Sequence, residues 1–86
     1  MSCLIVFRSI TYAQNAQGLF AKNGILATIM RPPLKLGKGS CSYALKLDGK
    51  YLKKACDLLL QTRIKIIGLY KTGGDGQYQE VGYDLL

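Results

Sequence analysis

The sequence predicts an α+β fold of the ferredoxin-like type, a β-α-β-β-α-β sandwich with a four-stranded antiparallel sheet and two helices on one face. Four short apolar runs are typical of strands, and two segments between them have helical periodicity. Glycine, proline and asparagine separate these segments. We expect one domain over residues 1–86, because a chain of 86 residues can bury only one simple core.

The first half of the chain predicts a strand, a helix and a second strand. The uninterrupted apolar run Cys3–Phe7 is typical of a strand that is buried on both faces. Residues 11–23 then follow the helical period, and Asn23-Gly24 is a helix stop. The apolar, β-branched run Ile25–Met30 predicts the second strand, which Pro32-Pro33 ends because proline has no backbone donor.

Two signals compete for the start of the first helix. Thr11 and Gln14 form a T-x-x-Q capping box, which predicts a start at Thr11. Ser9 is an alternative N-cap.

The second half repeats the pattern. Ser42–Leu47 predicts the third strand, and Asp48 is expected to cap the next element. Ile64–Tyr70 predicts the fourth strand, residues 72–76 a glycine-rich turn, and Gln77–Tyr83 a candidate fifth strand at the sheet edge. Between the third and fourth strands, apolar residues with helical spacing predict the second helix: Leu52, Ala55, Cys56 and Leu59.

Composition restricts the function. Twelve Lys and Arg against five Asp and Glu give a net charge of +7, which favours anionic partners. Histidine is absent, so the commonest general base and the commonest zinc ligand are missing, and we predict no metal site. No apolar run reaches the roughly 18 residues of a membrane span, and no signal peptide is recognisable, so we expect a cytoplasmic protein with no membrane partner.

The three cysteines are an odd number without C-x-x-C spacing, which favours reduced thiols over disulfides. Cys3 and Cys56 lie in apolar patterns and are expected in the core. Cys41 differs, because it lies between two serines in the sequence KGSCSY, after a basic loop.

The predicted topology brings Cys41 close to the first helix. With the strand order 4-1-3-2, the third strand starts beside the end of the first strand, where that helix begins. A helix N-terminus and nearby cations stabilise a thiolate, and the hydroxyls of Ser40 and Ser42 could donate to its sulfur. The residues alone leave an activated thiol and a structural thiol as equal alternatives. The cations expected at this edge are Arg8, Arg31, Lys35, Lys38 and Arg63.

An RNA-recognition module is a second possibility for a basic ferredoxin-like fold. Such modules stack bases on aromatic side chains of the central strands. Aligned on Lys38-Gly39, the chain has Ser40, Ser42 and Leu45 where aromatic residues would stand. Nucleic-acid binding is therefore not expected.

The chain resembles the short bacterial domains of the selenium/sulfur carrier-like family over residues 4–70. The resemblance rests on an ordered set of motifs, and the chain departs from the family at Ser42, where glycine is usual. It implies that Cys41 carries sulfur or selenium as a persulfide or selenosulfide. The motifs are Phe7-Arg8-Ser9, Gly24-Ile25, the loop Met30-Arg31-Pro32-Pro33, and Ser40-Cys41-Ser42-Tyr43-Ala44-Leu45.

We therefore predict a non-enzymatic carrier that needs no cofactor and receives sulfur or selenium from a donor such as a cysteine desulfurase, for delivery to an acceptor protein. The alternative is a regulatory or protein-interaction domain of the same fold, and a homo-oligomer is compatible with either. The predicted site comprises Cys41 as the carrier thiol and, around it, Arg8, Ser9, Thr11, Arg31, Lys38, Ser40 and Ser42.

Overall fold

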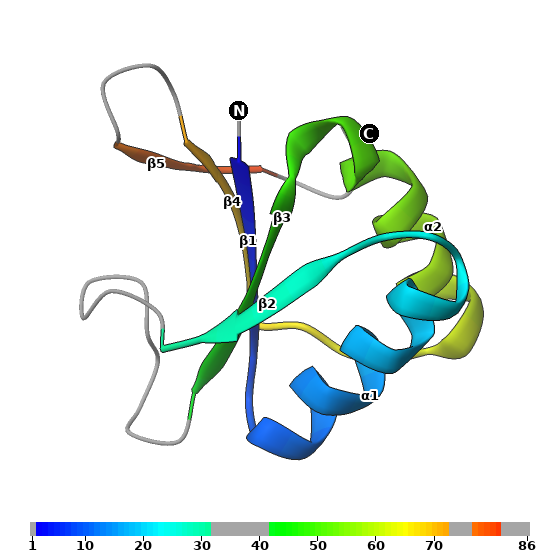
Figure 1. The fold of residues 1–86 in the computed structure, drawn as a ribbon. Coiled ribbons are helices and arrows are strands. Elements are labelled where there is room, and N and C mark those ends of the chain that lie inside the picture. The colour runs from blue at the N-terminus through cyan, green and yellow to red at the C-terminus, as the bar shows by residue number, and fades with distance from the viewer. Residues whose placement is uncertain (1, 32–41, 73–76, 82–86) are drawn as a thin grey trace.

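The computed structural model describes residues 2–31, 42–72 and 77–81, which form an α+β fold (Figure 1). Within these residues, two helices accompany a five-stranded antiparallel sheet of order β2-β3-β1-β4-β5. The first four strands have the expected order, and the fifth extends the sheet beyond β4. The elements are β1 (Ser2–Phe7), α1 (Ile10–Lys22), β2 (Ala27–Met30), β3 (Tyr43–Asp48), the 3-10 turn η1 (Gly49–Tyr51), α2 (Leu52–Thr62), β4 (Gly68–Thr72) and β5 (Tyr78–Glu80).

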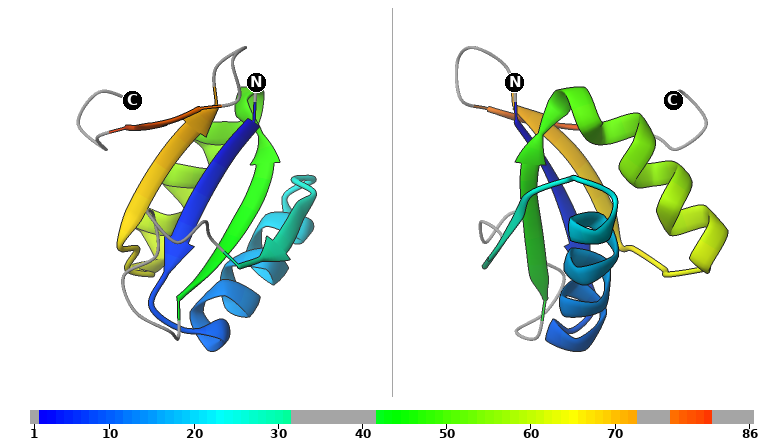
Figure 2. Two further views of the ribbon diagram at one scale, coloured as in Figure 1. Left: turned by 90° about the vertical axis from the view of Figure 1, so that its left-hand side faces the viewer. Right: turned by 45° about the vertical axis from the view of Figure 1, so that its right-hand side comes forward.

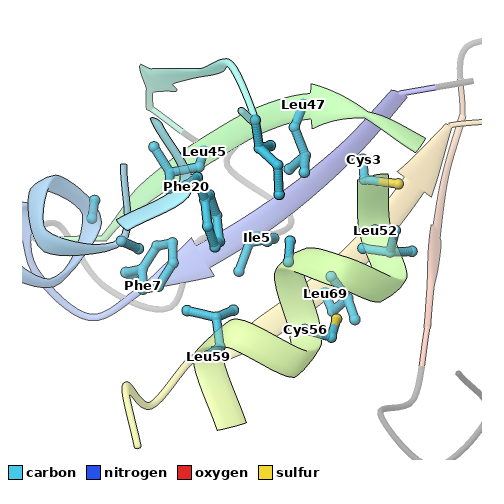
Figure 3. Close-up of a cluster of buried hydrophobic side chains, with 14 residues drawn as sticks. Cys3, Ile5, Phe7, Phe20, Leu45, Leu47, Leu52, Cys56, Leu59 and Leu69 are labelled. Carbon is cyan, nitrogen blue, oxygen red and sulfur yellow. The ribbon is translucent and has the colours of Figure 1, made fainter. Parts of the chain in front are cut away.

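Both helices cover the same face of the sheet, and the main core lies between them and the strands (Figure 2). Figure 3 shows side chains of β1, β3 and β4 meeting those of α1 and α2 in this layer. Phe7 and Phe20 are the largest side chains that are completely buried. Burial of such side chains is worth roughly 1.5–3 kcal/mol each, so this layer is the main stabilising element.

The central strand β1 is buried on both faces, as its uninterrupted apolar sequence predicts. On the face away from the helices, Leu4, Val6, Ala44 and Tyr70 form a second buried cluster. Phe7, the aromatic residue of β1, is fully buried on the helix side. Tyr43, the aromatic residue of β3, is half-buried and packs against the same core, so the aromatic side chains of both central strands lie on the face that the helices cover.

The predicted capping box at Thr11 and Gln14 is wrong. Helix α1 begins at Ile10, and Ser9 is its N-cap with an extended backbone (φ −146°, ψ 163°). The alternative signal was correct in position, although the Ser9 side chain makes no capping hydrogen bond. At the other end, the predicted stop is confirmed, because Gly24 has φ 79° and its N–H donates to Ala21 O at 3.2 Å.

The fourth strand starts later than predicted. The run Ile64–Tyr70 was expected to be strand, but β4 begins at Gly68, which pairs with Val6. Ile64 and Ile66 are apolar because they pack against the main core from the connection that precedes the strand. Burial and strand pairing give similar sequence patterns, so the pattern alone could not separate them.

Smaller shifts occur at the other strands. β2 begins at Ala27 and not at the predicted Ile25, because Ile25 is buried in the segment that ends α1. β3 starts one residue late, at Tyr43, and Asp48 accepts a hydrogen bond from Lys50 N at 3.0 Å, as its predicted capping role requires. The candidate fifth strand is confirmed in a shorter form, β5. Residues 73–76 of the predicted turn and Tyr83 lie outside the described residues.

Candidate functional site

The ends of three strands and the start of α1 meet at one edge of the sheet, which we call the basic edge. The last residue of β1, Phe7, pairs with the first residue of β3, Tyr43. Met30, the last residue of β2, pairs with Ala44. The prediction that the third strand starts close to the beginning of the first helix is therefore confirmed.

Five of the predicted site residues lie at this edge: Arg8, Ser9, Thr11, Arg31 and Ser42. Arg8, Thr11 and Arg31 are exposed and Ser9 is half-buried. Ser42 is only 3% exposed, so its hydroxyl lies beneath the surface. The other predicted members of the edge lie outside the described residues: Lys35, Lys38, Ser40 and Cys41.

Arg31 is held against the start of β3. Its guanidinium carbon lies 4.7 Å from the centroid of the Tyr43 ring, within the range of a cation–π interaction. Its Nη1 also donates to the backbone oxygen of Ser42 at 3.5 Å. The charge of Arg31 is thus fixed beside the residue at which the chain enters β3.

The two described thiols are core residues, as predicted. Cys3 is 0% exposed and Cys56 is 2% exposed, and both are free (Figure 3). Burial raises the pKa of Cys3 above its usual value. Burial, together with the charge of Asp57 and the neighbouring Cys3, raises the pKa of Cys56 to about 11. Both groups are protonated at neutral pH, so neither supplies a thiolate.

A pocket opens at the basic edge, between the first turn of α1 and the connection from α2 to β4. Its volume is about 360 Å³. We call it the cationic pocket, because three of the side chains that line it are positively charged. Its lining residues are Arg8, Tyr12, Arg63, Lys65, Ile66 and Ile67.

Of these lining residues, only Arg8 was in the predicted site, and Arg63 was among the cations expected at this edge; Tyr12, Lys65, Ile66 and Ile67 were not predicted there. The position of Lys65 could have been inferred from the predicted strand order. Because β4 is antiparallel to β1, the chain that enters β4 must lie at the edge where β1 ends. Cations in the α2–β4 connection therefore lie at the same edge as Arg8. A backbone hydrogen bond from Ile67 N–H to Val6 O, 2.8 Å long, holds the connection beside the end of β1.

A second, more apolar groove of about 480 Å³ lies beside the cationic pocket along the end of α2. It shares Arg63, Lys65 and Ile66 with that pocket and includes Leu60, which is 61% exposed. The described residues contain no cluster of acidic, cysteine or histidine side chains that could hold a metal ion. No described helix is both long and apolar enough to span a membrane.

The basic edge and the two inert core thiols define a small α+β protein with a positively charged site at the start of its first helix. A family model described as "Putative Se/S carrier protein-like" matches residues 2–71. The chain therefore belongs to this selenium/sulfur carrier-like family, as its sequence motifs predicted. Comparison with curated proteins and with solved structures finds no match.

Proposed function

We propose that this protein is a carrier that holds sulfur or selenium on Cys41 as a persulfide or selenosulfide. The observation that carries the proposal is the family match, which spans residues 2–71 and so includes Cys41. We also assign the fold to the ferredoxin-like type, on the basis of the strand order β2-β3-β1-β4 with both helices on one face.

The state of the other thiols supports Cys41 as the carrier. A carrier thiol must reach a donor protein and must react as a thiolate. Cys3 and Cys56 are buried and have raised pKa values, so they meet neither requirement. Cys41 directly precedes Ser42, at the point where the chain approaches the basic edge.

The charge of the basic edge suits an anionic cargo. A persulfide is ionised more readily than a thiol, so a carrier benefits from nearby positive charge and backbone donors. Arg8 and Arg31 supply charge, and the first turn of α1, from Ser9 to Thr11, supplies the positive end of a helix dipole. Lys38, Ser40 and Ser42 complete the proposed site through their places in the sequence beside Cys41.

The transfer step is redox-neutral. The Cys41 thiolate attacks the terminal sulfur of a donor persulfide, such as the one carried by a cysteine desulfurase. A new sulfur–sulfur bond forms to Cys41 as the donor's own sulfur–sulfur bond breaks, and the donor leaves as a thiolate. The acceptor repeats the exchange and restores the Cys41 thiolate. The chain has no histidine, so we assign the proton transfers to the partner proteins.

The test is sulfur transfer from a cysteine desulfurase charged with radiolabelled cysteine, followed on non-reducing gels. The wild-type chain and Cys3→Ala are expected to take up label that a reductant removes, whereas Cys41→Ser is expected to take up none. Circular dichroism checks that each variant is folded. Persistent reductant-sensitive labelling of Cys41→Ser would overturn the proposal and favour the alternative, a regulatory or protein-interaction domain in which Cys41 has no chemical role.

A further inference from the structure

We propose that the cationic pocket binds a phosphate-type oxyanion. Three positively charged residues line this pocket: Arg8, which follows β1, and Arg63 and Lys65, which precede β4. This inference does not depend on the carrier function of Cys41, and no residue of the pocket is a thiol.

The charge balance of the pocket favours an anion. The acidic side chains among the described residues are Asp48, Asp57 and Glu80, and none of them lines the pocket. Three like charges around one cavity repel one another, and a multiply charged anion removes that repulsion. Arginine favours phosphate in particular, because its planar group donates two parallel hydrogen bonds to a pair of oxygens.

The first turn of α1 adds to the positive potential. Tyr12 lines the pocket from this turn, and the Ser9 side chain makes no hydrogen bond to the helix N-terminus. The turn contains no acidic residue. The positive end of the helix dipole therefore lies beside the pocket, and no acidic side chain in the first turn offsets it.

The backbone of Arg63 is a separate indication that this side chain has a role. Arg63 ends α2 with φ 58°, the left-handed region, and it is the one non-glycine residue with positive φ among residues 2–31, 42–72 and 77–81. Glycine is the usual residue at such a helix end, because a side chain there is strained. An arginine held in that conformation points to a function outside folding.

The shape of the pocket allows the phosphate to be part of a larger molecule. Its volume of about 360 Å³ exceeds what a bare phosphate ion needs, and Ile66 and Ile67 form an apolar wall. The Tyr12 side chain is 45% exposed, so its ring is accessible to a ligand. The shared chemistry is a phosphate group, either as the free ion or as a phosphate ester.

The experiment is titration of the folded ¹⁵N-labelled chain with inorganic phosphate and, separately, with phenyl phosphate, at constant ionic strength set with chloride. Amide shifts that saturate at Arg8, Tyr12 and Lys65 are expected. A lower Kd for phenyl phosphate would identify an ester as the ligand class, and equal Kd values would identify the free ion. Shifts that do not saturate, or that are spread over all lysines, would overturn the proposal.

Three variants sharpen the result. Arg63→Gly and Arg8→Gln are each expected to weaken binding about tenfold, because each removes one charged donor. Lys53→Gln is the matched control, since it removes the same charge from an exposed site about 15 Å earlier along α2. If Lys53→Gln weakened phosphate binding equally, the attraction would be non-specific and the proposed binding site would be overturned.

Two further measurements separate this proposal from its rivals. Cys41→Ser is expected to bind phosphate like the wild type even though it accepts no sulfur, so failure of the carrier function leaves this result unchanged. Titration with a single-stranded RNA oligonucleotide tests a macromolecular anion. Binding of RNA across the sheet face, with a steep salt dependence and no saturable phosphate binding, would overturn the pocket in favour of a nucleic-acid interface.

Discussion

Phe7 pairs with Tyr43 across β1 and β3, and this pair joins the end of the central strand to the start of its neighbour. Phe7 is followed by Arg8 and the start of α1, whereas Tyr43 is preceded by Ser42 and, in the sequence, by Cys41. The register therefore brings the approach to β3 beside a positively charged helix start. Both proposals depend on this edge, one for the cargo on Cys41 and one for an oxyanion.

Removal of the Arg31–Tyr43 contact is expected to loosen the entry to β3. The interaction is partly exposed, and such cation–π pairs contribute about 0.5–1 kcal/mol. A double-mutant cycle with Arg31→Gln and Tyr43→Leu, measured by urea unfolding, is expected to give a coupling energy of that size. A coupling energy near zero would mean that the two side chains contact each other without stabilising the fold.

Arg63→Gly is expected to leave the free energy of unfolding unchanged or to raise it by up to about 1 kcal/mol. The left-handed backbone at φ 58° strains any side chain, whereas glycine adopts it freely. Urea unfolding measures the change, and Arg63→Val, with its β-branched side chain, is the control that should destabilise. A clear loss of stability in Arg63→Gly would show that the arginine stabilises the fold.

Gly68→Ala is expected to destabilise the protein by about 1–3 kcal/mol. A Cβ atom at Gly68 would lie 2.6 Å from Cε2 of Tyr70, and the Tyr70 side chain is only 8% exposed. The loss of stability caused by Gly68→Ala should largely disappear in a Tyr70→Leu background, where the ring is absent. Thermal unfolding of the wild type, the two single variants and the double variant checks this, and additive losses would show that the clash is not the cause.

The Cys56 thiol is expected to make stability fall as pH rises from about 9 to about 11. Its pKa is raised from 9.0 to about 11 in the folded protein, so over this range the unfolded chain releases the proton first. The folded state then binds more protons, and the free energy of unfolding decreases with pH. Cys56→Ala should show a shallower decrease than the wild type in urea titrations, and identical slopes would contradict the assignment.

Much of the fold could be predicted from the sequence. The apolar run of β1 and the helical spacing in α2 reflect burial directly, so these elements were found. The starts of α1 and β4 differ from the prediction, because Thr11 resembles a cap and because Ile64 and Ile66 are apolar for packing and not for strand pairing.

The candidate site was predicted only in part. The strand order identified the edge that Arg8, Arg31 and Ser42 share. The cationic pocket also depends on the left-handed backbone of Arg63 and on where Tyr12 and Lys65 lie in space. Sequence periodicity carries no information about either property. The burial of Ser42 was not predicted for a similar reason, since its place at the start of the predicted third strand does not say what packs over it.

The most direct test of the carrier proposal is peptide mass spectrometry of the wild-type chain after incubation with a persulfide donor and rapid alkylation of the folded protein. All three cysteines compete in one sample, so no substitution can disturb the fold. We predict an added sulfur atom on the peptide that contains Cys41, with Cys3 and Cys56 unmodified. Added sulfur on Cys3 or Cys56, or on no cysteine, would contradict it.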